Sequence, residues 1–302
     1  MKNKEHIDSE EKLLKQMREF TGDKSLKFIG LDDSFEFKCQ QCGKCCMNRN
    51  DIILNPFDIY NGAKYLGITT EEFILRYTHI DLGRESKIPM VTLRSESNGF
   101  CPLLKFDVKD GCKFKCIIHE AKPGACSNHP IGVTFETNKD NGDSKRRFIK
   151  VQQCENSTSN EVHTVKEWVK PYLDHIDEIN IAHQIQTLVT DYFNPKEFYK
   201  TVKLLELIAD EMTDCSLKKV SEETKNEFIE RSKEILTHYV ITSIRLGYEY
   251  DINKPFIEQA ERNMEKLRKF YEQTNKMHEG IKDIVSNLTK SLDKEEDSDG
   301  NN

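Results

Sequence analysis

The stretch from residue 39 to residue 46 reads Cys39-Gln40-Gln41-Cys42-Gly43-Lys44-Cys45-Cys46 and places four thiols within eight residues. Thiols spaced two residues apart are the ligands that a soft metal ion or an iron–sulfur cluster needs, because each must reach one small centre. The alternating segment Glu36-Phe37-Lys38 predicts a strand that leads into this stretch, and Ile52-Ile53-Leu54 predicts a short buried strand after it. We therefore expect a fold built around a metal site.

Length and charge narrow the class of protein. The chain has 302 residues, a length sufficient for one large domain or two ordinary domains that need no disulfides for stability. Its formal net charge is −7. There is no overall basic bias, so we expect no nucleic-acid partner. No apolar run reaches the roughly 18 residues of a membrane-spanning helix, so we expect no membrane partner.

The cysteines are concentrated in one half of the chain. Nine of the ten lie between Cys39 and Cys154, and Cys215 alone follows. The first 20 residues are charged and helical in pattern and do not resemble an export signal, so we expect a cytoplasmic protein. Disulfides are disfavoured in that compartment, which leaves metal binding as the first interpretation of the thiols.

Local signals predict an α+β fold. Gly22 is expected to end a first helix, Asn55-Pro56 to begin a second that ends at Gly67, and Thr69 to cap a third. Residues 131–135 and 147–151 are expected to form a hairpin, whereas the segment after Thr164 is helical in pattern throughout.

These signals predict four regions. They are an N-terminal helix and loop (1–30), a cysteine-rich metal-binding domain with short strands and helices (31–158), an all-helical domain of four or five helices (159–292) and an acidic disordered tail (293–302).

The thiol spacing leaves two kinds of centre open. Cys39 and Cys42 followed by Gly43 are typical of a tight turn that directs two sulfurs at zinc. The run Cys39, Cys42, Cys45 also matches the start of a bacterial ferredoxin ligand set, whose fourth cysteine precedes proline, and Cys101-Pro102 provides such a pair far away in sequence. The side chains of Cys45 and Cys46 would diverge in extended backbone, which favours a polynuclear site, two sites or one spectator thiol.

Longer spacings resemble a known family. Cys39-x2-Cys42-Gly43-x-Cys45-Cys46, Cys101-Pro102-Leu103-Leu104, Cys116-Ile117-Ile118-His119-x2-Lys122-Pro123-x2-Cys126, His129-Pro130 and Cys154 resemble the CxxCxxCC cysteine-cluster proteins. This YkgJ-like family is described as zinc- or iron-chelating and is often labelled as containing an iron–sulfur cluster. The resemblance covers roughly residues 35–155 and implies eight metal ligands: Cys39, Cys42, Cys45, Cys46, Cys101, Cys116, Cys126 and Cys154.

The chain also departs from the family pattern. Cys112 has no counterpart, and His119, Lys122 and Ser127 stand where members usually carry Tyr, Arg and Arg. These changes spare the ligands but remove a planar guanidinium that Lys cannot reproduce. Some relatives are flagellin lysine methylases, although this chain has no glycine-rich nucleotide fingerprint.

The remaining candidates are interpreted from composition. His119 and His129 lie in the ligand-rich segment and are candidates for metal ligands or hydrogen-bond donors to ligands. Cys215 is expected in a helical core.

Two functions are therefore expected, and the resemblance implies a third, a protein lysine methylase related to the flagellin N-methylases. The first is an iron–sulfur or other metal-binding protein with a redox or methyl-transfer role. The second is a structural zinc module whose helical domain binds a protein partner. The sequence alone does not decide whether the chain is an enzyme.

Overall fold

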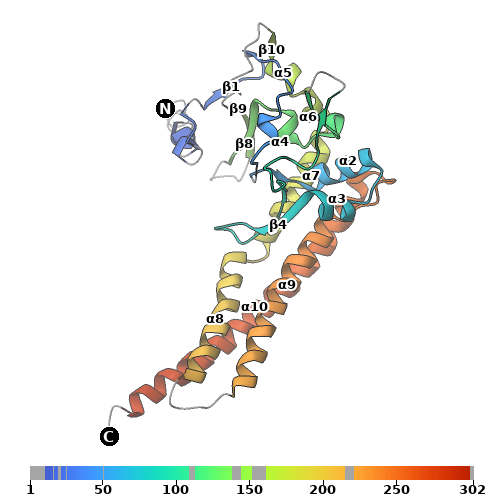
Figure 1. The fold of residues 1–302 in the computed structure, drawn as a ribbon. Helices are drawn as coiled ribbons and strands as arrows, with labels where there is room; N and C mark the ends of the chain where they lie inside the picture. Colours follow the sequence, from blue (N-terminus) through green and yellow to red (C-terminus); the bar gives the residue numbers. More distant parts are fainter. Residues whose placement is uncertain are drawn as a thin grey trace. The chain divides into compact units, whose positions relative to one another are not determined.

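The structure is a computed structural model that describes residues 11–15, 17–19, 22–24, 26–49, 51–108, 113–137, 144–151, 161–214 and 221–299. It contains helices and short antiparallel strands, so the predicted α+β class is confirmed. The chain divides into two compact units, residues 1–52 with 93–176 and residues 53–92 with 177–302. We call them the cysteine unit and the helical unit (Figure 1).

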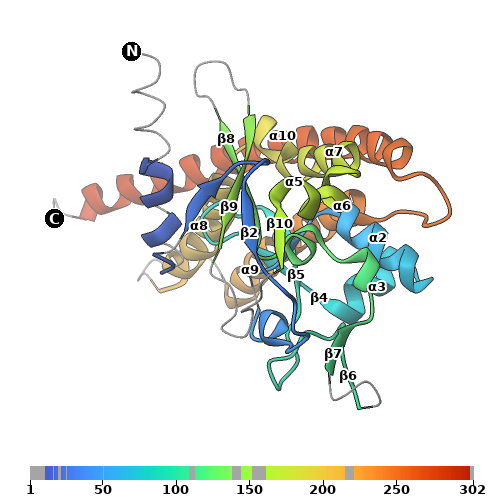
Figure 2. The same ribbon diagram turned by 90° about the horizontal axis from the view of Figure 1, so that it is seen from above.

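A three-stranded antiparallel sheet anchors the cysteine unit. Its order is β1 (Lys27–Ile29), β9 (Ser144–Lys150), β8 (Ile131–Thr137), and Ile131 lies opposite Lys150 in the predicted hairpin. Figure 2 shows β8 and β9 side by side, with β1 on the other side of β9.

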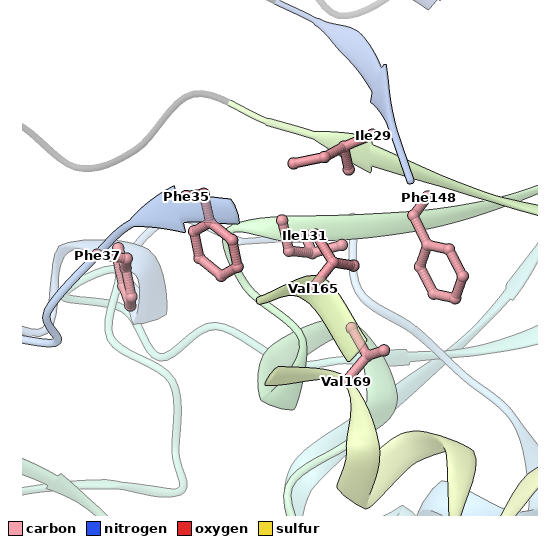
Figure 3. Packing of buried hydrophobic residues seen from close by; sticks show 7 residues of the cluster. All are labelled: Ile29, Phe35, Phe37, Ile131, Phe148, Val165 and Val169. Atoms are coloured by element: carbon pink, nitrogen blue, oxygen red, sulfur yellow. The ribbon is translucent and has the colours of Figure 1, made fainter. Parts of the chain in front are cut away.

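The core of this unit lies where the sheet meets a second strand pair. β2 (Ser34–Glu36) pairs with β10 (Val162–Thr164), which leads directly into the short helices α5 (Val165–Trp168) and α6 (Lys170–Leu173). The buried side chains come from strands and helix alike (Figure 3): Ile29, Phe35, Phe37, Ile131, Phe148, Val165 and Val169. The strand predicted at residues 36–38 ends two residues earlier in the structure, at Glu36, but Phe37 still packs in the core.

The cysteine-bearing segments of this unit are short. They comprise the 3-10 turn η1 (Lys44–Cys46), the hairpin of β6 (Leu104–Asp107) and β7 (Lys113–Cys116), the turn η2 (His119–Ala121) and the one-turn helix α4 (Gly124–Ser127).

The helical unit begins with a strand and two capped helices. β3 (Ile53–Leu54) pairs with β5 (Pro89–Leu93), which also neighbours β4 (Thr78–Leu82). Asn55 caps α2 (Pro56–Leu66) in a reciprocal capping box with Asp58, and Gly67 ends the helix with a left-handed φ of 66°. Thr69 caps α3 (Thr70–Tyr77) by accepting a hydrogen bond from the Glu72 amide.

Long helices make up the rest of the helical unit. α7 (Ile176–Thr187) and the turn η3 (Leu188–Asp191) lead to three longer helices. These are α8 (Pro195–Asp214), α9 (Glu222–Tyr248) and α10 (Phe256–Asp299), which pack along one another (Figure 1). Phe198 is fully buried, with its ring edge-on to Phe193, Tyr239 and His278. Among the helices of the described ranges, none combines the length and apolar character needed to cross a bilayer.

Two features differ from the regions expected from sequence. Residues 53–92, which fall within the predicted 31–158 domain, belong to the helical unit because the rings of Phe57 and Tyr60 pack on Phe256, and Tyr60 also packs on Tyr250. α10 continues to Asp299, so helix extends through most of the segment predicted to be disordered. Its Lys and Glu residues have good helix propensity.

Candidate metal centre

A glycine shapes the turn that presents the first thiols. Gly43 has a φ of 73°, and the Cys46 amide donates to its carbonyl oxygen at 2.9 Å, so Cys45 and Cys46 lie in a tight 3-10 turn. A Cβ at this position would lie 3.0 Å from Cγ of Phe114. Both the left-handed backbone and the close ring therefore favour glycine.

Backbone hydrogen bonds bring distant segments to this turn. The Phe114 amide donates a hydrogen bond to the carbonyl oxygen of Gln41 at 3.0 Å, and the Cys101 amide donates one to the carbonyl oxygen of Cys46 at 2.9 Å. The β6–β7 hairpin then places Cys116 opposite Leu104. The main chain thus holds the Cys101 and Cys116 segments beside the first cysteine run without any disulfide.

Seven predicted ligands line one pocket, which has a volume of about 100 Å³. They are Cys39, Cys42, Cys45, Cys46, Cys101, Cys116 and Cys126. The other walls are largely apolar and include Phe37, Ile52, Leu93, Leu103, Leu104, Phe114 and Pro123. No disulfide joins these seven cysteines; Cys39 and Cys45 are exposed, and the others are partly buried. The eighth predicted ligand, Cys154, lies outside the described residues, as do Cys112 and Cys215.

The thiols converge on the pocket without forming a finished coordination shell. Within the described residues, no three His, Cys, Asp or Glu side chains are arranged as the ligands of one metal ion. The ligand set therefore stays a prediction, supported by the shared pocket.

The adjacent pair Cys45 and Cys46 differs from the expectation for extended backbone. Their Sγ atoms lie 3.8 Å apart, and both residues belong to the 3-10 turn η1 and not to an extended segment. Two sulfurs bound at about 2.3 Å to one tetrahedral ion would be separated by about 3.8 Å. The pair is thus compatible with a single ion, and it no longer favours a polynuclear site.

Charges around the pocket act unequally on the thiols. The hydrogen bond with Cys46 lowers the pKa of Cys45 to about 6, and the positive charges of Lys122 and Arg49 act in the same direction. The same hydrogen bond and burial raise the pKa of Cys46, whereas burial raises that of Cys101 to about 11. A bound metal ion would favour the ionised form of Cys46 and Cys101 and so oppose these upward shifts.

Arg49 is a pocket residue that the sequence interpretation missed. Its guanidinium bonds to both carboxylate oxygens of Asp51, at 2.6 and 3.0 Å, and approaches the Cys45 carbonyl oxygen at 3.5 Å. Asp51 fixes the guanidinium and raises the Arg49 pKa. An arginine three residues after the last cysteine of the run was the available signal.

Both histidines of the ligand-rich segment line the pocket, but their environments differ. His119 is exposed, whereas the Nε2 atom of His129 is shielded from solvent. Burial lowers the pKa of each, and nearby cations, Lys122 for His119 and Arg49 for His129, add to the effect.

Comparison with known families agrees with this site. Residues 38–156 match the CxxCxxCC model, whose description is "Putative zinc- or iron-chelating domain". The match spans all eight predicted ligands and confirms the resemblance over this part of the chain. No curated protein and no solved structure matches the chain.

Proposed function

We propose that this chain binds zinc or iron at the thiol pocket of the cysteine unit. The observation that carries the proposal is that seven thiols from separate segments, spanning residues 39–126, line one small pocket. The proposed ligands are the seven thiols of this pocket together with Cys154. We also propose a cytoplasmic location, because no disulfide joins these pocket cysteines and disulfides are disfavoured in that reducing compartment.

The donor set fits a soft or borderline metal. Thiolate is the ligand of structural zinc and of iron–sulfur clusters, and the apolar walls limit access of water. Arg49 and Lys122 place positive charge near the thiols and would offset part of the negative charge of a thiolate-rich centre. When bound, zinc would supply structural cross-linking, and an iron–sulfur cluster would supply one-electron chemistry.

Two forms of the centre are each supported by one observation. The number of thiols exceeds the four that close a zinc site, which favours an iron–sulfur cluster with a redox or methyl-transfer role. The Cys45–Cys46 separation of 3.8 Å suits a single tetrahedral ion, which favours zinc. In the zinc form the helical unit would bind a protein partner, and its exposed apolar side chains include Leu204, Leu207 and Ile284. No feature of the pocket adds support for a lysine methylase.

Anaerobic purification of the full chain tests the proposal. We expect stoichiometric metal: iron with acid-labile sulfide and a brown colour for a cluster, or zinc without colour for the structural form. Cys42→Ser should lose most of the metal, whereas Cys215→Ser, outside the family pattern, should keep it. A wild-type protein that binds neither metal, or a Cys42→Ser variant that keeps full stoichiometry, would contradict the ligand assignment.

Removal of the metal provides a second readout. A bound ion stabilises the folded state by mass action, so chelation should lower the stability of the cysteine unit. Trp168, the single tryptophan, packs on Phe35 and Phe37 in the core of that unit and reports its unfolding by fluorescence. An unchanged urea midpoint after complete removal of the metal would contradict a structural role.

A further inference from the structure

We infer that His129 supplies a nitrogen ligand, through Nε2, to the metal bound in the thiol pocket. This inference rests on the proposed metal-binding function and adds a donor outside the eight cysteines. It changes the expected centre from all-sulfur to mixed sulfur and nitrogen.

Local structure places His129 beside a predicted ligand. Cys126 lies in α4, and His129 follows it at C-x-x-H spacing. The Cys126 amide donates to the carbonyl oxygen of Pro123 at 2.8 Å, and the Asn128 amide donates to that of Gly124 at 3.1 Å. The turn of α4 therefore continues to the residue before His129. Residues three apart in such a turn lie on the same side, and both residues line the pocket.

The imidazole has a polar atom that lacks a partner. Among the described residues nothing forms a hydrogen bond with Nε2 of His129, and this atom is closed off from solvent. A buried polar nitrogen left in this state destabilises the folded protein, because it has lost its hydrogen bonds to water. The ring is held edge-on to Phe37, with centroids 5.9 Å apart, so the apolar wall fixes it without satisfying the nitrogen. A metal ion bound in the pocket would give this nitrogen a partner.

His119 provides the contrast that makes this inference specific. It lines the same pocket, but its side chain is exposed, so water can satisfy its ring nitrogens. Imidazole and thiolate together form common zinc sites of the Cys₃His and Cys₂His₂ types. Of the two histidines, His129 is therefore the one whose environment calls for a metal.

X-ray absorption of the zinc-loaded protein tests this inference. The full chain is stripped of metal under reducing conditions and loaded with one equivalent of Zn²⁺ alone. In zinc sites, nitrogen lies at about 2.0–2.1 Å and sulfur at about 2.3 Å. We expect the wild type to show a nitrogen shell with imidazole multiple scattering. This shell should vanish in His129→Ala and persist in His119→Ala.

Affinity gives an independent readout. His129→Ala should weaken zinc binding by more than the roughly 10- to 100-fold expected for loss of an outer-shell partner. His129→Cys should restore binding with an all-sulfur shell.

The outcomes separate the two proposals. A wild-type shell of sulfur alone, or a nitrogen shell that survives in His129→Ala, would overturn the role of His129 and leave metal binding intact. Failure of the wild-type protein to bind zinc or iron would overturn both. Circular dichroism of each variant checks that the fold is retained, and the His129→Cys result keeps the test decisive should His129→Ala fold poorly.

Discussion

Replacing Gly43 by alanine should disturb the thiol turn more than its size suggests. A φ of 73° costs an L-residue about 1–2 kcal/mol. The new Cβ would also lie 3.0 and 3.1 Å from Cγ and Cδ2 of Phe114 and 3.3 Å from Leu104. The Phe114 ring cannot move away freely, because it packs on Phe100 and Phe106 at centroid distances of 5.4 and 5.0 Å. Overpacking of this kind costs about 1–3 kcal/mol, giving a total of about 2–5 kcal/mol.

Urea unfolding followed by Trp168 fluorescence measures this cost in the cysteine unit, and metal analysis measures its effect on the centre. Gly22→Ala is the matched control, because Gly22 lies in the same unit with a φ of 72° and has nothing within 4 Å of the added Cβ. It should lose at most about 1–2 kcal/mol and keep its metal. Equal losses in the two variants, with the metal retained in both, would refute the proposed role of the contact with Phe114.

Three further predictions concern titration and hydrogen bonding. In metal-free protein at pH 7, iodoacetamide should modify Cys45 much faster than Cys101, because pKa values of about 6 and 11 give about nine-tenths and about one ten-thousandth thiolate. Burial lowers the pKa of His278 below the ordinary value. As the pH falls, the imidazole is therefore protonated at a higher pH in the unfolded chain than in the folded protein. The stability of the helical unit should therefore fall as the pH drops through about 6.5, and His278→Gln should flatten that dependence. Tyr248→Phe should cost about 1–3 kcal/mol, because the buried hydroxyl donates to Leu54 O at 3.3 Å and accepts from Gln186 Nε2 at 3.1 Å.

Each of these predictions has a defined counter-result. Mass spectrometry that finds Cys45 and Cys101 modified at equal rates would contradict the assigned pKa difference. Circular dichroism melts from pH 5 to pH 8 should distinguish His278→Gln from the wild type, and identical slopes would exclude a contribution from His278. Tyr65→Phe serves as the control for Tyr248→Phe because its side chain is half exposed. Equal stability of the two would mean that the buried hydroxyl contributes nothing.

Features with local causes were predictable from the sequence. The cap at Asn55 and the left-handed end at Gly67 depend on residues within one helix, and both are confirmed. The hairpin of β8 and β9 likewise follows from the strand-like segments 131–135 and 147–151 and the polar segment that joins them. The C-x-x-C-Gly pattern correctly indicated a tight turn at Gly43.

Features with nonlocal causes were not predictable. The β6–β7 hairpin lacks a clear alternation of apolar residues, and its position depends on the Phe114–Gln41 hydrogen bond. The Cys101 segment likewise reaches the first cysteine run through the hydrogen bond from the Cys101 amide to the Cys46 carbonyl oxygen, 55 residues away in sequence. The unpaired state of His129 Nε2 depends on burial, which composition does not reveal.

The discontinuous course of the chain has a consequence for any attempt to isolate the matched segment. Residues 38–156 include α2, whose aromatic side chains Phe57 and Tyr60 pack on residues at and just before the start of α10. A fragment cut at the ends of the match would keep Phe57 and Tyr60 but lose Tyr250 and Phe256. It would carry an uncovered aromatic surface, and such surfaces promote aggregation. We therefore expect a stable fragment that contains the family match to need the start of α10 as well.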